Sequence, residues 1–522
     1  MGNRKTFNIT GPCIRELHYM VDTSVRIQTI IEKYIEQGEY ITINRARQYG
    51  KTTTIECLYR ALRDRYVVID LSFEGKEDYF VSLDSFCMGL TMDVADCLRD
   101  ESPKLAEIFD QPVSRSLPMR DLSSRISVLC TQSGREVLLF IDEVDKASDN
   151  NVFLSFLGML RDKYIDRQRG RGNTFKSVVL AGVHDIKNIR MKLRPEEKHQ
   201  YNSPWNIAAK FDVDMSFSIS DIQSMLQEYE RDYHTGMNTE YVSGRIYYYT
   251  EGYPYLVSDL CKTVHDDGLD WDLKGIDEAE KRIIKSNNTL FDDMIKNLEQ
   301  HEEFRELVER ILVRGAQVAF EIRNPEIDRG LMYGIFREEN GRIKISNIIF
   351  ETVIFNYLIS IAETGEIIDR YTNEKSQFIQ NGKLNMNVLL NRFQAFMYSE
   401  YRDEDSSFIE QQARLLFLSF LKPVINGTGH YVVETQTRGN RRMDIVVFYG
   451  GDEHIVELKI WHGELAEQRG YEQLAGYLRY RGQNKGYLLS FCDNRKSPRK
   501  GTAFHYKGLE IVEVVISYRD KA

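Results

Sequence analysis

Residues 40–65 read YITINRARQYGKTTTIECLYRALRDR. Residues 40–44 alternate apolar and polar side chains, as a short strand does, and apolar residues recur at helical spacing across Ile55–Leu62. Gly50–Thr52 joins the two segments after a short connection. The stretch therefore predicts a strand, a tight loop and a helix, in that order.

Phosphate-binding loops have this order of elements. Backbone N–H groups at a helix N-terminus attract anions, and Gly50 lets the backbone approach phosphate oxygens closely. Lys51 would reach the β- and γ-phosphate oxygens, and the Thr52 hydroxyl would bind Mg²⁺. The full pattern has a glycine five residues earlier, where this chain has Arg45. An ordinary helix start with an exposed lysine is the alternative interpretation.

A second segment, residues 137–143, supports the phosphate-binding interpretation. VLLFI is a continuous apolar run, as expected of a strand buried on both faces, and Asp142 and Glu143 follow it. Ligands of open α/β sheets bind at the carboxyl ends of the strands. Asp142 would hold Mg²⁺ and Glu143 would orient and deprotonate the attacking water. A strand that ends in surface acids is the alternative, but together the two segments predict a nucleoside triphosphate site.

Composition limits the class of protein. The 522 residues are 42% hydrophobic and 28% charged, which is typical of a globular protein with about three domains. No apolar run approaches the roughly 20 residues that a membrane span needs, and the first residues do not resemble a secretory signal. The cysteines are odd in number and form no Cys-x-x-Cys pair, which favours reduced core residues in the cytosol and no zinc site. They are Cys13, Cys57, Cys87, Cys97, Cys130, Cys261 and Cys492.

The charge is unevenly distributed. The net charge is −10, but residues 430–522 hold 15 Lys and Arg against 12 Asp and Glu, a balance of +3, which leaves −13 for residues 1–429. The basic residues gather in three clusters, which would form a phosphate footprint or simply a solvated face. These clusters are Arg438, Arg441 and Arg442; Arg479, Arg481 and Lys485; and Arg495, Lys496, Arg499 and Lys500.

Strand and helix patterns alternate through the first half of the chain. This alternation predicts a parallel sheet with helices on both faces. The expected strands are residues 40–44, 66–71, 137–141, 177–181 and 211–217. A capping box at Ser220–Gln223 would begin a helical lid that continues through 240–250 and 255–264. Tyr19 and Met20 are candidates to line a base pocket or to serve plain packing, and His184 would sense the γ-phosphate or lie at the surface.

These segments resemble the STAND-type and archaeal-ATPase-like branch of the AAA+ ATPases. The resemblance rests on Arg47–Thr52, Ile141–Glu143 and Thr250–Leu256. The resemblance implies that the ligand is ATP with Mg²⁺, and that a Gly-x-Pro motif of the lid, at Gly252 and Pro254, lies near the nucleotide. Arg45 is compatible with this branch, because its members commonly lack the first glycine of the phosphate-binding pattern. Arg190 and Arg194 are the candidates for an arginine finger. The expected nucleotide contacts are Arg47, Gln48, Tyr49, Gly50, Lys51, Thr52, Thr53, Asp142 and Pro254.

Residues 299–360 follow the pattern of a winged helix. Residues 304–312 are helical in pattern, Asn324-Pro325 begins a second helix, and Asn340-Gly341 indicates a type I′ hairpin turn. Winged helices bind DNA or serve as internal packing modules, and both alternatives stay open. The polar interval 361–388 is predicted to be a linker.

The last part of the chain predicts a second site. Residues 408–421 form an amphipathic helix that carries Glu410, and strands follow at 431–435, 443–449 and 455–460. Pairing of the last two strands would bring Asp444 beside Glu457, and alternation places Lys459 on the same face as Glu457. Paired carboxylates suit Mg²⁺, and the lysine would orient or deprotonate water. Glu-x-Lys alone is also an ordinary exposed ion pair.

The ordered set resembles the PD-(D/E)XK nuclease superfamily. It comprises Glu410 on a helix, Asp444 on a strand, Glu457-Leu458-Lys459 on the next, and Gln473 and Tyr477 one turn apart on a helix. The resemblance implies a metal, Mg²⁺ or Mn²⁺, held at Glu410, Asp444, Glu457 and Leu458, with Lys459, Gln473 and Tyr477 assisting catalysis. Met443 replaces the usual proline.

The sequence thus predicts an α/β P-loop NTPase with a helical lid and a winged helix, followed by an α/β nuclease-like domain. The boundaries are 1–218 for the ATPase core, 219–298 for the lid, 299–360 for the winged helix, 361–388 for the linker and 389–522 for the nuclease-like domain. The expected function is an ATPase whose nucleotide state controls a metal-dependent nuclease acting on nucleic acid. The alternatives are a nucleotide-gated binding switch that does not cleave, and a slow ATPase that assembles into nucleotide-dependent homo-oligomers.

Overall fold

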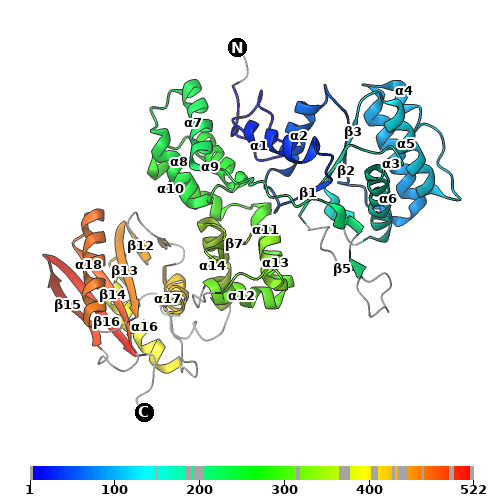
Figure 1. Cartoon of the computed structure of the whole chain (residues 1–522). Coiled ribbons are helices and arrows are strands. Elements are labelled where there is room, and N and C mark those ends of the chain that lie inside the picture. The colour runs from blue at the N-terminus through cyan, green and yellow to red at the C-terminus, as the bar shows by residue number, and fades with distance from the viewer. Residues whose placement is uncertain are drawn as a thin grey trace. The chain divides into compact units, whose positions relative to one another are not determined.

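The computed structural model describes two compact units. One comprises residues 1–294 with 321–337, and the other comprises residues 295–320 with 338–522. Each is described by itself (Figure 1). The described residues are 4–147, 150–183, 190–191, 201–202, 204–312, 318–363, 377–400, 410–425, 429–432, 445–460, 464–492 and 499–517.

A parallel sheet forms the core of the first unit. In the described part of this unit four strands lie in the order β1-β4-β3-β2, and all neighbouring pairs are parallel. Every residue of β3 and β4 is buried, as the apolar runs predicted, because helices cover both faces. The strands are β1 (Ile41–Asn44), β2 (Val67–Ser72), β3 (Val137–Asp142) and β4 (Ser177–Gly182).

Two groups of helices cover the sheet, and each contributes one apolar cluster to the core. On one face, α3, α5 and α6 pack their apolar side chains on the sheet; on the other, α1, the π-helical turn that continues it and α2 do so. The bounds are α1 (Ser24–Ile30), η1 (Ile31–Ile35), α2 (Lys51–Leu62), α3 (Leu83–Arg99), α4 (Pro103–Ala106), α5 (Pro118–Gln132) and α6 (Asn151–Gln168).

The prediction of a last strand at residues 211–217 is wrong. The chain there forms no strand, and its neighbour Ala209 makes only an isolated bridge with Ile41. The alternation of apolar and acidic residues in FDVDMSF imitates a strand, but the side chains of Arg45 and Arg26, not a neighbouring strand, bind the carbonyl oxygens of Val213 and Ser216 in this segment. We refer to residues 209–217 as the strap.

Helices follow the strap where the sequence predicted a lid, and we refer to these helices as the lid. The capping box that begins the first of them lies at Ser218 and Asp221, not at Ser220–Gln223 as predicted, because the helix starts earlier and both reciprocal hydrogen bonds form there. The helices are α7 (Ile219–Tyr233), α8 (Thr239–Thr250), α9 (Pro254–Asp266), α10 (Leu273–Lys285) and α11 (Thr289–Gln300).

The elements between residues 302 and 363 follow the predicted pattern of helices and a hairpin. The Asn324 side chain accepts hydrogen bonds from Glu326 N and Ile327 N at the start of α13, and Asn340 and Gly341 both have positive φ, as a tight hairpin turn requires. The elements are α12 (Glu302–Leu312), α13 (Pro325–Met332), β7 (Phe336–Glu339), β8 (Arg342–Ile345) and α14 (Ile348–Glu363).

The described residues of the interval 361–388, which was predicted to be a linker, contain regular structure. Its described residues include the end of α14, a small antiparallel hairpin and the first turn of α16. The hairpin strands are β9 (Ile379–Gln380) and β10 (Lys383–Leu384).

A mixed sheet organises the rest of the second unit. In its described part six strands lie in the order β11-β12-β13-β14-β16-β15, with β13, β14 and β16 parallel to one another. Helix α18 packs against β13, β14 and β16, whereas α16 contacts β15 and β16. The elements are α16 (Met386–Glu400), α17 (Glu410–Ile425), β11 (Gly429–Val432), β12 (Ile445–Tyr449), β13 (Asp452–Ile460), α18 (Glu464–Arg481), β14 (Lys485–Cys492), β15 (Arg499–Tyr506) and β16 (Leu509–Ser517).

Among the described helices, none combines the length and apolar character needed to cross a bilayer.

Candidate nucleotide and metal sites

The loop between β1 and α2 has the backbone of an anion-binding turn. Gly50 adopts φ +81° and Gln48 adopts φ +55°, so the chain turns sharply before the helix. No side chain caps the first turn of α2, which leaves its N–H groups directed toward the space in front of the helix. A phosphate group is a fitting partner for these donors.

Lys51 is held inside this loop. Its ammonium donates hydrogen bonds to the carbonyl oxygens of Arg45 at 3.0 Å and Ala46 at 2.9 Å. The side chain is buried, and burial lowers the pKa of Lys51, while the nearby Asp145 and Glu143 carboxylates act in the opposite direction. Since both hydrogen bonds go to neutral oxygens, an anionic phosphate would be a stronger partner for the same ammonium.

Thr52 and Asp142 meet at the end of β3. The Thr52 hydroxyl donates to Asp142 Oδ2 at 2.6 Å, although the two residues are 90 positions apart in the sequence. A hydroxyl and a carboxylate are hard oxygen donors, which suits Mg²⁺. The structure therefore brings together the two side chains that the sequence suggested as magnesium ligands.

Glu143 follows directly after the strand with a strained backbone. Its φ is +55°, and its N–H donates to Asp142 Oδ1 at 2.9 Å. Burial and the charge of Asp142 raise the pKa of Glu143. A carboxylate with a raised pKa is a better proton acceptor, so Glu143 is suited to deprotonating a water molecule.

A cavity of about 770 Å³ lies in front of these residues. A volume of this size accommodates a small organic ligand. Among the predicted contacts, the cavity is lined by Gln48, Tyr49, Gly50, Lys51, Thr52, Thr53, Asp142 and Pro254, together with Glu143. Arg47 does not line it: its side chain forms an ion pair with Asp293, and its carbonyl accepts a hydrogen bond from Tyr253 Oη.

Part of the cavity lining is apolar. Met20, Met215, Phe217 and Met225 contribute side chains there, and such a surface suits a nucleobase. Tyr19 also lines the cavity, but its hydroxyl donates to Asp232 Oδ2 at 2.7 Å. Tyr19 therefore also joins the N-terminal segment to lid helix α7.

Sequence reasoning missed two charged residues of this cavity. Asp70 lies in the middle of β2, where burial and the neighbouring charge of Asp142 raise its pKa to about 6. Arg26, on α1, lines the cavity and donates to the Ser216 carbonyl at 2.9 Å. An acid inside the apolar strand VVIDLS was the available signal for Asp70, whereas nothing local marked Arg26.

A family model, the AAA-like domain, matches residues 13–353 of this sequence. The chain belongs to the AAA-like domain family. The match includes the phosphate-binding loop, the Asp142 strand, the lid and the elements as far as α14. The α/β fold with its parallel sheet is that of the P-loop NTPases, and the domain is ATPase-like, as the sequence predicted. No curated protein matches the sequence.

Several solved structures are similar to this chain. The Walker-type ATPase PABY2304 of Pyrococcus abyssi is 12% identical, with a TM-score of 0.47, over 67% of this chain and 99% of its own. ORC1 of Aeropyrum pernix, in complex with DNA, is 11% identical, with a TM-score of 0.31, over 66% and 94%. The RuvB Holliday junction branch migration motor of Thermotoga maritima is 11% identical, with a TM-score of 0.33, over 65% and 96%.

Three other residues predicted for the AAA-like domain fall outside what the structure describes. His184 lies outside the described residues, as does Arg194, and the side chain of Arg190 is not described. The roles of γ-phosphate sensor and arginine finger therefore stay predictions.

Beyond the AAA-like domain, β13 carries the predicted Glu-x-Lys pair. Lys459 Nζ lies 3.2 Å from Glu457 Oε1, which is the proximity expected of neighbours on one face of a strand. The Glu457 side chain is completely buried, and that of Lys459 is 22% exposed. An ideal Cβ on Gly470 would lie 3.4 Å from Lys459 Cγ, so the lysine stem passes beside α18.

The other predicted residues of this site are described only in part. Asp444 lies outside the described residues, and Glu410 begins α17 without a described side chain. Gln473 and Tyr477 lie on α18, the first half-buried and the second buried, and Leu458 is buried on β13. Within the described ranges, no three His, Cys, Asp or Glu side chains converge on a metal position.

The structure adds a buried acid that sequence reasoning missed. Glu513, on β16, accepts hydrogen bonds from Ser490 Oγ at 2.8 Å and from Tyr471 Oη on α18 at 3.1 Å. Glu457 and Glu513 are both in register with Leu488 of β14, so they flank it in one row across the sheet. An acid in the apolar strand LEIVEVVIS was the signal that could have identified it.

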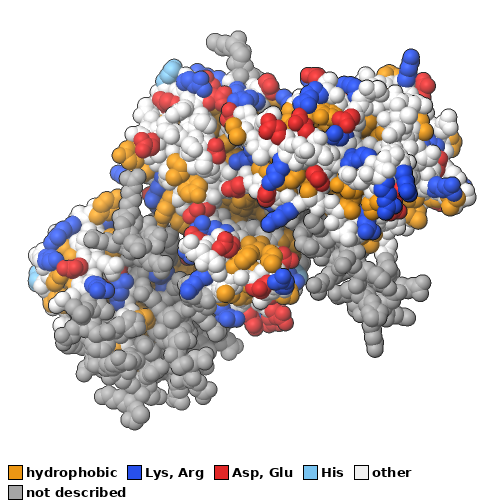
Figure 2. All heavy atoms as spheres, viewed as in Figure 1, with side chains coloured by type: hydrophobic (Ala, Val, Ile, Leu, Met, Phe, Trp, Pro, Cys, Tyr) orange, Lys and Arg blue, Asp and Glu red, His pale blue; other side chains and the backbone are white. Residues whose placement is uncertain are grey.

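Two members of the middle basic cluster are neutralised by acids. Arg481 Nη1 lies 3.7 Å from Glu453 Oε1, and Lys485 Nζ lies 2.8 Å from Glu510 Oε1. Arg438, Arg441, Arg442, Arg495 and Lys496 lie outside the described residues. Over the first unit, Figure 2 shows acidic and basic side chains interspersed on the visible face. The solvated-face interpretation suits the described pairs better than a phosphate footprint.

Proposed function

We propose that the AAA-like domain binds and hydrolyses ATP, and that its nucleotide state controls a metal-dependent nuclease in the C-terminal part of the chain. The contact between Thr52 and Asp142 carries the first half of the proposal. It joins the helix N-terminus to the carboxyl end of β3, the two places where a P-loop NTPase holds phosphate and Mg²⁺.

Each residue of the nucleotide site has a defined task in this proposal. Lys51 leaves the carbonyls of Arg45 and Ala46 and binds the β- and γ-phosphate oxygens. Thr52 and Asp142 would hold Mg²⁺, which supplies charge neutralisation on the phosphates when bound. Glu143 orients the attacking water and accepts its proton, which its raised pKa favours.

For the nuclease, the proposal is supported by a buried ion pair next to a helix. Glu457 would bind Mg²⁺ or Mn²⁺ together with Asp444 and Glu410, and Lys459 would orient the water that attacks phosphorus. Asp444 directly precedes Ile445, and Ile445 pairs with Val456, the residue before Glu457. Gln473 and Tyr477 on α18 would contact the nucleic acid strand.

The nuclease half is tested by incubating the full chain with plasmid, single-stranded DNA and RNA, with Mg²⁺ or Mn²⁺, in the presence and absence of ATP. We expect cleavage by the wild-type protein, loss of cleavage in Lys459→Ala, and loss of nucleotide control in Lys51→Ala. Absence of cleavage by the wild-type protein under all these conditions would remove the nuclease proposal and leave the ATPase proposal intact.

One observation favours the non-cleaving binding switch as a second candidate. Glu457 is completely buried and already paired with Lys459, and a buried carboxylate in an ion pair has less need of a metal. Calorimetric titration with Mg²⁺ separates the two candidates. A nuclease should lose Mg²⁺ affinity in Asp444→Ala, whereas a binding switch should give the same titration for wild type and variant.

A further inference from the structure

Arg45 stands at the position where the general phosphate-binding pattern has glycine, and its backbone is part of the site. Its N–H donates to the Gly182 carbonyl of β4 at 3.2 Å. Its own carbonyl oxygen accepts the Lys51 ammonium at 3.0 Å. Movement of Lys51 toward a phosphate would therefore remove a partner from the Arg45 backbone.

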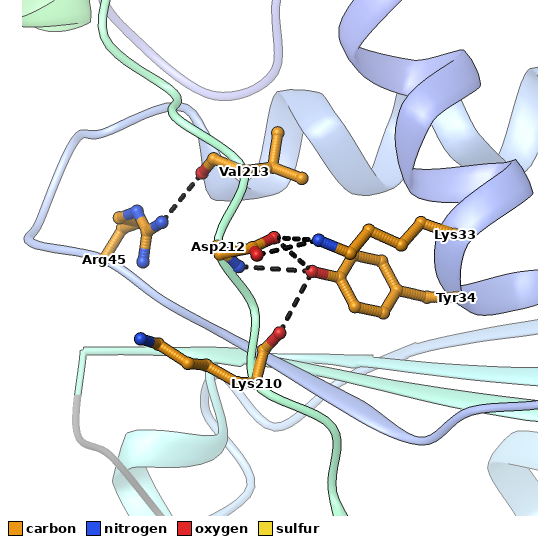
Figure 3. A network of polar contacts seen from close by, with 6 residues as sticks. All are labelled: Lys33, Tyr34, Arg45, Lys210, Asp212 and Val213. Carbon is orange, nitrogen blue, oxygen red and sulfur yellow. Dashed lines mark hydrogen bonds and ion pairs between the residues drawn. The ribbon is translucent and has the colours of Figure 1, made fainter.

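The Arg45 side chain reaches the strap and contacts it at Val213 (Figure 3). Its Nη2 donates to the Val213 carbonyl at 2.8 Å, and its Nη1 donates to the Asn44 carbonyl at 2.9 Å. The guanidinium carbon lies 5.1 Å from the centre of the Phe211 ring, within range of a cation–π contact. Burial lowers the pKa of Arg45, and a guanidinium stays charged nevertheless.

The strap also lines the nucleotide cavity and contacts the lid. Met215 and Phe217 line the nucleotide cavity, and Phe217 N donates to the Gly252 carbonyl between α8 and α9 at 2.8 Å. A Cβ on Gly252 would lie 2.0 Å from the Phe217 carbonyl oxygen, so the two chains touch without room for a side chain. The strap therefore contacts Arg45 of the phosphate-binding loop at Val213 and the lid at Phe217.

A second anchor holds the strap without touching the loop. Lys33 Nζ lies 2.6 Å from Asp212 Oδ1, and Tyr34 Oη donates to the same oxygen at 2.7 Å. Both partners of the Lys33–Asp212 ion pair are about half exposed, so the pair contributes little to stability. The Lys33–Asp212 pair provides a matched control. Asp212 directly precedes Val213 in the strap, and Lys33 belongs to η1, which is outside the nucleotide site.

We propose that Arg45 is a positioning residue that couples phosphate binding at the loop to the strap and the lid. The inference rests on the proposed binding of ATP. When Lys51 exchanges the Arg45 carbonyl for a phosphate oxygen, the Arg45 backbone shifts, and the guanidinium transmits the shift to Val213. A glycine at this position has no side chain to make that connection, so the departure from the general pattern is functional in this chain.

The test compares Arg45→Met, Arg45→Lys and Lys33→Met in the full chain. Nucleotide affinity is measured with a fluorescent ATP analogue, and amide hydrogen exchange is measured for the loop, the strap and the lid, with and without a saturating non-hydrolysable ATP analogue. We expect Arg45→Met to weaken nucleotide binding on the order of tenfold, the loss of one charge-assisted hydrogen bond. Lys33→Met should stay within about twofold of the wild type, as expected of an exposed pair.

Coupling is measured as the change in amide hydrogen exchange that the nucleotide analogue causes. If Arg45 had only a structural role, its replacement would leave this change in place. In the wild type, the analogue should slow exchange in residues 45–54, in the strap and at the start of α9. In Arg45→Met at saturation, the slowing should persist in residues 45–54 and disappear in the strap and α9. Arg45→Lys retains a cation that can reach one carbonyl and should restore part of the strap response.

The inference is overturned if Arg45→Met keeps the wild-type strap and lid response, or if Lys33→Met loses it equally. Circular dichroism and the unfolding temperature of each variant identify a folding defect, in which case Arg45→Lys carries the comparison. If the wild type binds no nucleotide, the proposed function fails. Amide hydrogen exchange of the strap in the nucleotide-free protein then tests whether Arg45 holds the strap in place. Equal strap exchange in the wild type and Arg45→Met would show that it does not.

Discussion

The nucleotide site and the Glu457–Lys459 site differ in how far apart in sequence their residues lie. Thr52 and Asp142 are 90 positions apart, so a hydrogen bond of 2.6 Å between them exists only because the sheet and α2 are folded together. Glu457 and Lys459 are two positions apart on one strand, and the pleat alone brings such side chains to the same face. Proximity is therefore strong support for function in the first site and weak support in the second.

What strengthens the second site is its set of distant contacts. Gly470 on α18 lies beside the Lys459 stem, and Glu513 binds residues of β14 and α18. These contacts place two buried carboxylates and a lysine beneath one helix. The comparison shows that the C-terminal site has to be judged by its non-local partners.

The largest expected effect is on the nucleotide site. Lys51→Ala removes the ammonium that we propose binds phosphate oxygens, and loss of one partner from a buried charged hydrogen bond costs about 2–5 kcal/mol of binding free energy. We expect ATP affinity measured by calorimetry to fall by that amount. Lys104→Ala, at an exposed position on α4, is the control and should leave affinity unchanged. Equal affinity in Lys51→Ala and wild type would show that the cavity does not bind phosphate through this lysine.

The next effect tests whether the C-terminal pair is structural. Lys459→Met leaves the completely buried Glu457 carboxylate without this ammonium, and we expect the free energy of unfolding of the second unit to fall by about 2 kcal/mol. The double variant Glu457→Gln/Lys459→Met should be less destabilised, because the buried charge is gone. Scanning calorimetry measures both. A double variant less stable than Lys459→Met would show that Glu457 has other stabilising partners.

A smaller effect is expected at the buried acid that the structure added. Tyr471→Phe removes one hydrogen-bond donor from Glu513, which should lower the free energy of unfolding by about 1–2 kcal/mol. Tyr480→Phe on the same helix, where the side chain is 80% exposed, should have no measurable effect. Similar unfolding temperatures for the two variants would mean that Glu513 does not depend on Tyr471.

The smallest effect is a pH dependence at Asp70. Its pKa is raised to about 6 in the folded chain, above the usual value of about 4, so the folded state binds the proton more tightly than the unfolded state. The contribution of Asp70 to stability is therefore largest below pH 4 and is lost as the pH rises from about 4 to about 6. Asp70→Asn should raise the unfolding temperature at pH 7 and flatten its change across that window, whereas Asp64→Asn, at an exposed position, should not.

Local patterns were sufficient for many of the predicted elements. The structure contains four features that depend only on residues adjacent in the sequence. They are the order of strand, loop, Gly-Lys-Thr and helix, the apolar strand ending in Asp142, the cap at Asn324 and the turn at Asn340-Gly341. The strand expected at 211–217 failed for the opposite reason. Whether an alternating segment joins a sheet depends on which groups bind its carbonyls, and here they are the distant side chains of Arg26 and Arg45.

The sequence by itself determined that this chain has an ATPase-like α/β domain, in which a strand, a loop with Gly-Lys-Thr and a helix follow one another and an apolar strand ends in an acid. These signals are short and depend only on residue type and order. Only the tertiary structure decided what Arg45 contacts, that Asp70 lies in the cavity, and that Glu513 shares a row with Glu457. Each of these depends on which strands and helices become neighbours, and that is set by packing over distances that no local pattern spans.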